Sequence, residues 1–412
     1  MKSILVVGFN TRPLAKSLNK AGYDVYAVDF FGDLDLFPHV KDCLIITKEL
    51  ELNYELLKDK YSNFLVHFTI EMLRKYNNID FLLIGSGLDD AYEGRYKILE
   101  VIKEKELSIK DINNDLETIK KARDIEKIYK YLRSIGLKVP LSVSYEKFRN
   151  NNKSLFDFPF VLKKKRSAGG INVFKIENEE RLSFQLKLLE LNGFDPADWL
   201  IQEFIEGIPV SCTTISNGVE CEVISINRQI IGEKFLNPPG DFTYCGNIVP
   251  ANLLKEDNKL ISEISSKLTK ELGLKGINGF DFVLKNHYPN LMEINPRIPG
   301  SIRASEDVLD LNLLNLHIQS FAPKKWDSVK IKIRTVRPSG FATKLILFAP
   351  KNVDKKVLNR INNLEFVHDK TNPVKSIIKE EPLCTILFKG KTFSESYFGA
   401  LKIVNRIKNM IN

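Results

Sequence analysis

The chain begins with a short apolar run, Ser3 to Val7, which Gly8 interrupts. A run without polar alternation is typical of a strand buried on both faces, as in parallel sheets that helices cover. Apolar residues at helical spacing follow from Pro13 to Lys20, and a second apolar strand runs from Asp24 to Val28. This order predicts a βαβ unit, so we expect a small Rossmann-like domain over residues 1–110.

The rest of the chain predicts a mixture of strands, helices and one hairpin. A chain of 412 residues is long enough for roughly two or three packed domains. We expect an α+β region over residues 111–325, with single helices over 119–134 and 308–321. Residues 326–412 contain two short apolar runs and a final helical pattern, which predict a small C-terminal α+β subdomain. The expected fold class is therefore α/β and α+β.

Composition excludes several classes of protein. Lys and Arg total 61 against 52 Asp and Glu, a net charge of +9, but the basic residues are spread along the whole chain. This spread indicates a solvated surface rather than a face for nucleic acid or membrane. The five cysteines include no CxxC pair, which argues against a disulfide framework or zinc site and fits a reducing compartment. No apolar run approaches the ~18 residues that cross a bilayer, so we expect a soluble cytoplasmic protein.

The segment from Asp281 to Arg297 is the strongest candidate for a functional site. With a turn centred near His287, two antiparallel strands place Asp281 opposite Glu293, and Asn295 shares a face with Glu293. Opposed carboxylates repel unless a cation lies between them, and carboxylate and amide oxygens suit Mg²⁺. Arg297 follows on the same side with a planar group suited to phosphoryl oxygens. The alternative, an exposed hairpin with ordinary surface charges, is disfavoured by the apolar residues between these groups.

Two further segments have features of a nucleotide site. A predicted strand ends at Lys163 and leads into the loop Ser167-Ala168-Gly169-Gly170, where glycine lets backbone N–H groups approach phosphate oxygens. The residue order of a P-loop is absent. The segment Leu200 to Gly207, Leu-Ile-Gln-Glu-Phe-Ile-Glu-Gly, offers a hydrophobic strand whose backbone could bind an adenine. Each of these segments alone also fits an ordinary strand and turn.

Taken in order, the three segments resemble the ATP-grasp superfamily, and the resemblance covers residues 110–320. The N-terminal βαβ domain looks like the pre-ATP-grasp domain of that superfamily. The tail at Glu381 to Gly390 resembles the small C-terminal domain of its biotin-carboxylase-like branch. The opening Val7 to Arg12, together with Asp29 to Asp33, looks most like archaeal carboligase-like proteins of unassigned substrate.

The resemblance implies ATP and Mg²⁺, or Mn²⁺, as cofactors and carries roles over residue by residue. The residues that would bind ATP are Lys163, Gly169, Gly170, Gln202, Glu203 and Ile205. Those that would hold the metal are Asp281, Glu293 and Asn295. Arg297 would be catalytic, because it would stabilise the charge on the transferred phosphoryl group.

One position departs from the family pattern. Members usually have a Lys beside an Asp at the start of the helix before the grasp, whereas Arg123-Asp124 stands here. Arg123, Lys121 or Lys127 would have to take the place of that Lys.

The implied reaction is an ATP-dependent ligation. A substrate carboxylate is activated as an acyl phosphate and attacked by an amine, which gives ADP and phosphate. The expected partners are a small-molecule carboxylate and amine, with neither nucleic acid nor membrane, and a homodimer is expected for an enzyme of this size. The alternatives are a non-catalytic or regulatory ATP-binding protein and a bicarbonate-using carboxylase.

The other substrates are expected where the N-terminal strands end, at Gly8 to Arg12 and at Gly85 to Asp90. Tyr244 to Asn247, together with Ser301 and Arg303, could complete an acceptor pocket. Arg12 and Arg303 each fit either a carboxylate-binding group or a surface charge.

A dinucleotide-dependent enzyme is a rival hypothesis, because Asp29 follows Gly8 by about twenty residues. The GxGxxG pattern is not complete, since Asn10 and Pro13 stand where glycines are required. Proline there removes the close helix packing that the pattern needs, so the sequence disfavours this hypothesis.

Overall fold

The computed structural model describes residues 1–51, 57, 60–106, 108–152, 155–166, 169–372 and 377–411. Within these ranges no helix is both long and apolar enough to cross a bilayer. Ser167 and Ala168, the first half of the predicted glycine loop, lie outside the described residues.

The N-terminal part forms a five-stranded parallel sheet in the order β3-β2-β1-β4-β5. Its strands are β1 (Ser3–Gly8), β2 (Asp24–Asp29), β3 (Asp42–Ile45), β4 (Phe81–Ile84) and β5 (Lys110–Asp111). Its helices are α1 (Arg12–Lys20), α2 (Ile46–Glu49), α4 (Tyr61–Lys75) and α5 (Tyr92–Glu104). Every residue of β1 is buried, as its unbroken apolar run predicted. The expected Rossmann-like sheet is therefore confirmed.

An eight-stranded antiparallel sheet occupies the centre of the molecule, in the order β14-β13-β10-β11-β12-β15-β17-β16. Its strands are β10 (Ile208–Asn217), β11 (Cys221–Ile231), β12 (Tyr244–Val249), β13 (Lys275–Lys285), β14 (Tyr288–Asn295), β15 (Phe341–Phe348), β16 (Val367–His368) and β17 (Pro382–Gly390). The helices of this part are α6 (Leu116–Arg123), α7 (Ile125–Ser134), α10 (Lys255–Glu271), α11 (Ile302–Leu309), α12 (Leu313–Ser320), α13 (Trp326–Thr335), α14 (Lys355–Asn362) and α15 (Phe393–Ile411).

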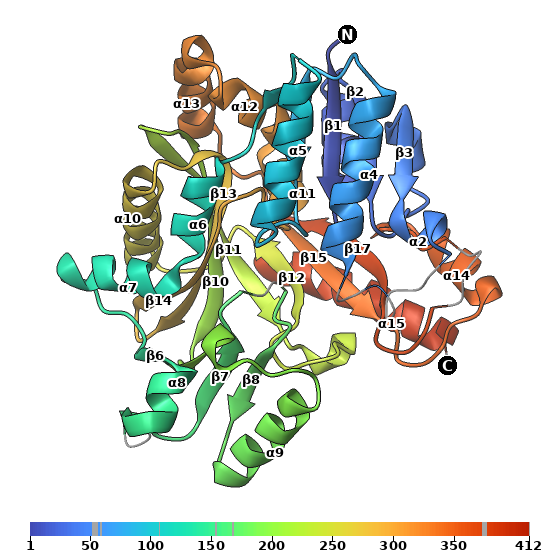
Figure 1. The fold of residues 1–412 in the computed structure, drawn as a ribbon. Coiled ribbons are helices and arrows are strands. Elements are labelled where there is room, and N and C mark those ends of the chain that lie inside the picture. The colour runs from blue at the N-terminus through green and yellow to red at the C-terminus, as the bar shows by residue number, and fades with distance from the viewer. Residues whose placement is uncertain are drawn as a thin grey trace.

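A smaller antiparallel sheet, in the order β6-β9-β7-β8, lies with α8 and α9 at one end of the molecule (Figure 1). Its elements are β6 (Ser142–Ser144), α8 (Tyr145–Lys147), β7 (Phe160–Lys164), β8 (Val173–Ile176), α9 (Glu179–Glu190) and β9 (Trp199–Glu203). This sheet has a core of its own, rich in aromatic side chains such as Phe160 and Trp199.

The C-terminal tail does not form a separate sheet. β15 pairs with β12 and β17 pairs with β15, so the tail extends the central sheet by three strands. α15 packs against β15 and β17. The division at residue 325 remains a prediction, but the backbone hydrogen bonds cross it without a break.

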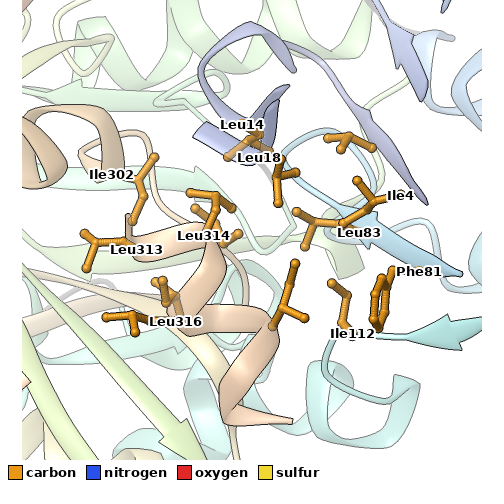
Figure 2. Packing of buried hydrophobic residues seen from close by; sticks show 14 of the residues in the cluster. Ile4, Leu14, Leu18, Phe81, Leu83, Ile112, Ile302, Leu313, Leu314 and Leu316 are labelled. Atoms are coloured by element: carbon orange, nitrogen blue, oxygen red, sulfur yellow. The ribbon is translucent and has the colours of Figure 1, made fainter. Parts of the chain in front are cut away.

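One hydrophobic core joins the N-terminal sheet to the helices that follow the hairpin. Figure 2 shows Ile4, Leu14 and Leu83 of the N-terminal part packed towards Leu313 and Leu314 of α12. Each large side chain buried in this way contributes about 1.5–3 kcal/mol. The loops at the carboxyl end of the parallel sheet are thereby held in place against the central sheet.

Two predicted helices are each broken in the structure. The single helix expected over 119–134 is wrong, because Asp124 has non-helical angles (φ −85°, ψ 82°) and caps α7 by accepting from the Lys127 amide. The single helix expected over 308–321 is also wrong. Asp310 adopts a left-handed conformation (φ 50°), and Asn312 then caps α12.

Candidate active site

A cavity of about 1480 Å³ lies between the three sheets and receives side chains from both ends of the chain. All ten residues that the sequence assigned to ATP, metal or catalysis line it. They are Lys163, Gly169, Gly170, Gln202, Glu203, Ile205, Asp281, Glu293, Asn295 and Arg297. The walls also include the N-terminal loops, from Phe9 to Pro13 in part and from Gly85 to Gly87, and the tail residues Lys344 and Asp369.

The hairpin β13–β14 has the register that the sequence predicted, with Asp281 paired to Glu293 and Gly279 paired to Asn295. The tight turn begins after Lys285, so uninterrupted pairing would place Met292 opposite Asp281. A bulge between Asp281 and Phe282 shifts the register by one residue and brings Glu293 into that position. The bulge therefore creates the facing pair of acids.

The environment of Asp281 favours a bound cation. Its carboxylate accepts hydrogen bonds from Gln229 Nε2 and Asn295 Nδ2, each at 2.8 Å. Burial, and then the negative charge of Glu293, raise the pKa of Asp281 to about 7. A divalent ion between the two acids would remove that penalty.

The hairpin offers few protein ligands for such a cation. Among the described residues no three His, Cys, Asp or Glu side chains gather as a metal site. A cation here would have two carboxylates and the Asn295 amide oxygen, and would need phosphate oxygens and water to complete its shell. That shortage suits Mg²⁺, which usually keeps waters and substrate phosphates among its ligands.

Arg123 is the basic residue that reaches the hairpin. Its Nη1 donates to Glu293, and its Nε and Nη2 bind Asp90 at 3.1 and 2.9 Å. Of the other two predicted replacements, Lys121 is exposed, and Lys127 pairs with Asp124 at the surface. Arg123 thus occupies the place next to the acids and ties Glu293 to the N-terminal part.

Arg297 is held by a carboxylate that the sequence did not single out. Asp89, on the loop after β4, accepts from Arg297 Nε at 2.5 Å, with side-chain exposures of 5% and 14%. Arg297 Nη2 lies 3.5 Å from Asn295 Oδ1. Burial alone would raise the pKa of Asp89, but the positive charges of Arg297, Arg123 and Arg95 outweigh it and lower that pKa. The guanidinium is therefore fixed beside the hairpin.

Lys163 and the glycine loop form another wall. Burial lowers the pKa of Lys163, and the charge of Glu293 partly opposes this shift. Gly170 has a positive φ of 80°, and a Cβ built on it would lie 1.8 Å from the Phe242 carbonyl oxygen. Only glycine fits this approach of the loop to the segment before β12.

The segment after β9 has mixed roles. Gln202 lines the cavity, but its amide donates to the Tyr129 hydroxyl at 2.9 Å, and that hydroxyl donates to the Leu291 carbonyl at 2.6 Å. Glu203 is exposed, and its carboxylate accepts from the Leu141 amide at 3.2 Å. Ile205 is buried and gives this wall an apolar surface.

The two arginines considered for a substrate carboxylate are both engaged within the protein. Arg12 is 2% exposed, and its Nε binds Asp369 at 2.7 Å. Arg303 pairs with Asp307 of its own helix at 2.6 Å. Neither lines the cavity, whereas Ser301 and Tyr244 do.

Asp29 is fully engaged by its own loops, which leaves little capacity for a dinucleotide ribose. It is 2% exposed and accepts four hydrogen bonds, two from Thr11 and one each from the amides of Phe31 and Gly32. Its role is to fix the loops after β1 and β2, which agrees with the incomplete glycine pattern.

Comparison with known proteins found a family match for the stretch of the chain that holds all ten residues assigned to ATP, metal or catalysis. Residues 122–301 match the model of the ATP-grasp domain. An uncharacterized protein of Methanocaldococcus jannaschii is 27% identical over 393 residues, which span 93% of this chain and 88% of that protein.

Solved structures share the whole arrangement of sheets. An L-amino acid ligase from Bacillus licheniformis superposes with a TM-score of 0.69 at 16% identity, covering 98% of this chain and 97% of that one. A biotin carboxylase from Campylobacter jejuni gives a TM-score of 0.67 at 15% identity, covering 100% and 95%. The fold match therefore includes the N-terminal sheet and the tail as well as residues 122–301.

Proposed function

We propose that the chain belongs to the ATP-grasp superfamily, whose domain model residues 122–301 match, and that it is an ATP-dependent ligase. In the proposed reaction an oxygen of a substrate carboxylate bonds to the γ-phosphorus of ATP, and the bond to the β-γ bridging oxygen breaks, releasing ADP. The nitrogen of an amine then attacks the acyl carbon, loses a proton, and phosphate leaves. The observation that carries the proposal is the cavity wall where Arg297 stands beside the facing acids Asp281 and Glu293.

The residues of the cavity divide between the parts of Mg-ATP. Asp281, Glu293 and Asn295 would hold Mg²⁺, or Mn²⁺, which neutralises phosphate charge when bound. The phosphates would lie near Lys163 and the backbone of Gly169 and Gly170. The adenine would lie against the wall from Gln202 to Ile205, where Glu203 and Ile205 contribute backbone groups. This assignment fits the raised pKa of Asp281, which marks a site short of positive charge.

Catalysis in this scheme is electrostatic. Arg297 would bind the oxygens of the phosphoryl group in transfer, and Asp89 would keep the guanidinium aimed at them. No enzyme nucleophile is required. The Arg123–Glu293 pair would have to loosen as the metal enters, so Arg123 is positioned to meet a phosphate oxygen in place of the family's usual Lys.

A carboxylase that uses bicarbonate is the second candidate, and the fold shared with a biotin carboxylase supports it. A regulatory ATP-binding protein is the third. A homodimer stays a prediction.

ADP release with a substrate panel separates these functions. The protein is incubated with Mg-ATP, a set of carboxylic acids including bicarbonate, and a set of amines. Release that needs both an acid and an amine supports the ligase, and release with bicarbonate alone supports the carboxylase. Tight ATP binding without ADP from any combination would support the regulatory function.

The hairpin is tested by Glu293→Gln, which removes one negative charge from the metal site and keeps its shape. We expect the Mg²⁺-dependent rate of ADP release to be abolished. An unchanged rate would show that the metal binds elsewhere.

A further inference from the structure

Asp33 is a buried carboxylate that no other described residue pairs with. It lies four residues beyond the end of β2, is 8% exposed, and lines the same cavity as the ATP-binding residues. Among the described residues its carboxylate has neither a hydrogen bond nor an ion pair, and the nearby charges of Asp369, Asp29 and Asp35 act against it. Burial and these neighbours raise the pKa of Asp33 well above its usual value, against the opposing charge of Arg12. Such a group is costly unless something pairs with it.

The neighbouring acids already have partners. Asp29 is saturated by the loops after β1 and β2. Asp35 accepts from the backbone amides of Asp369 and Lys370, at 3.2 and 2.8 Å, which joins this loop to the tail. Asp369 binds Arg12. Within the described part of the chain, Asp33 is thus the member of the cluster whose carboxylate is left for a ligand.

Arg12 does not pair with Asp33 directly. Its Nε is shared between Asp369 at 2.7 Å and Asp35 at 3.5 Å, and its buried Nη1 has no partner among the described residues. A water bridging Nη1 and Asp33 is the structural alternative, and it makes a different prediction for stability, which is used below.

Aromatic side chains from the same N-terminal part of the chain also line this cavity. Phe9, Phe31 and Tyr61 are lining residues, with ring centroids 4.9 Å apart for Phe9 and Phe31 and 5.0 Å apart for Phe9 and Tyr61. Aromatic faces attract cations, and an acid beside them adds a charge-assisted hydrogen bond. A carboxylate with aromatic walls suits a protonated nitrogen better than an anion.

The same cavity also holds the proposed site of phosphoryl transfer. The positive charges of Arg12 and then Lys344, on β15, lower the pKa of Asp369 against the effect of burial. Lys344 Nζ also donates to the Gly300 carbonyl at 3.1 Å, and Gly300 follows Arg297 by three residues. A substrate bound at Asp33 would lie in the same cavity as Arg297.

We infer that Asp33, with the rings of Phe9, Phe31 and Tyr61, forms a subsite for a protonated nitrogen of the second substrate, an ammonium or guanidinium group. The role of this subsite in catalysis rests on the proposed ligase function. The bound cation is not the attacking nitrogen, because a nucleophilic amine must be unprotonated. The substrate class is therefore a compound with two nitrogen groups, or an acid that carries a distant amino group.

Calorimetric titration with probes that carry or lack a distal charge tests this inference in the presence of Mg-ADP. The charged probes are 1,5-diaminopentane, agmatine and L-lysine. Their counterparts without the distal charge are 1,5-pentanediol, which is uncharged, and L-norleucine, which keeps its α-amino and carboxyl groups but lacks the side-chain ammonium. We expect at least one charged probe to bind the wild-type protein and its counterpart to bind about tenfold more weakly or not at all. Asp33→Asn should weaken the charged probe by about tenfold or more, whereas Glu100→Gln, an exposed acid on α5, should not.

Thermal unfolding without any probe supplies the second measurement. Asp33→Asn should leave the melting temperature unchanged or raise it, because it removes a carboxyl group whose ionised form the fold opposes. A lower melting temperature would show that the fold satisfies Asp33, as a water bridge to Arg12 would, and would overturn the inference. Equal binding of the charged probes and their counterparts, or no binding of any charged probe, would overturn it too.

The subsite and the ligase function can fail separately. ADP release that requires an acid and an amine, with no dependence on a second nitrogen group or on Asp33, would retain the ligase and reject the subsite. Asp33-dependent binding of charged probes, with no ADP from any acid and amine, would retain the subsite and reject the ligase.

Discussion

The ion pair between Asp89 and Arg297 gives a prediction whose size can be worked from the structure. Asp89→Asn keeps the shape of the side chain but removes the negative charge that faces Arg297, Arg123 and Arg95. Loss of one partner of a fully buried pair costs about 3–5 kcal/mol. Arg297 is 14% exposed and keeps its bond to the Ile298 carbonyl, and an asparagine oxygen can still accept from Nε, so we expect about 2–3 kcal/mol.

Thermal unfolding should show this loss as a modest shift. An unfolding entropy of about 2.1 cal/mol/K per residue gives about 0.9 kcal/mol/K for the whole chain, so the melting temperature should fall by about 2–3 °C. The rate constant kcat for ADP release should fall by about 10–100-fold, because the guanidinium is no longer held in line with the phosphoryl group. The KM for ATP should change little.

The loss of stability at acidic pH provides a second test of the Asp89–Arg297 pair. The pKa of Asp89 is lower in the fold than in the unfolded chain. Its contribution is therefore present above about pH 4 and is lost as the pH falls through the folded pKa. Asp89→Asn should remove this part of the acid destabilisation.

Asp24→Asn is the matched control, since Asp24 pairs with Lys41 at 3.2 Å on the surface, with exposures of 28% and 62%. It should cost under about 0.5 kcal/mol and leave kcat unchanged. An Asp89→Asn protein with wild-type melting temperature and kcat would refute the claim that Asp89 positions Arg297.

Two further substitutions test the walls of the cavity. Gly170→Ala places a Cβ against the Phe242 carbonyl at a φ of 80° and should raise the KM for ATP severalfold. The control Gly136→Ala, at a φ of 79° with open space around it, should affect stability alone. Equal effects of the two substitutions on KM would contradict the role of the loop that contains Gly170. Tyr129→Phe leaves the Gln202 amide and the Leu291 carbonyl without their shared partner and should lower the free energy of unfolding by about 1–3 kcal/mol. The control Tyr96→Phe, at an exposed tyrosine, should not lower it. A Tyr129→Phe protein with wild-type thermal unfolding would show that this bridge contributes nothing to stability.

Local patterns in the sequence were sufficient to predict the hairpin, but they did not reveal the bulge that produces its register. Alternation placed Glu293 and Asn295 on one face, and a turn assumed at His287 placed Asp281 opposite Glu293. The real turn is earlier, and a bulge compensates: opposite the step from Asp281 to Phe282, β14 carries one extra residue, Met292. A bulge depends on packing between strands, so a residue pattern does not reveal it.

The partners of the basic groups were beyond sequence reasoning. Asp89 lies on a loop of the parallel sheet, 208 residues before Arg297, and only the packing of two sheets brings the two together. Arg12 donates a hydrogen bond to Asp369, which lies 357 residues later in the chain. Lys344 was missed for the same reason.

The broken helices are a different kind of error. Apolar periodicity continues across Asp124, and the pattern therefore predicted one helix. Asp124 and Asn312 are both residues that favour helix N-caps, so these local signals were available and were outweighed by periodicity.

The pairing of β12 with β15 has a consequence for how the protein can be divided. A chain that ended at residue 325 would leave the outer side of β12 with free N–H and C=O groups, where a neighbouring molecule could add a strand. The tail therefore shields an aggregation-prone edge of the first 325 residues while it supplies Lys344 and Asp369 to the cavity. The solubility of the first 325 residues and the complete lining of the cavity depend on the same few backbone hydrogen bonds.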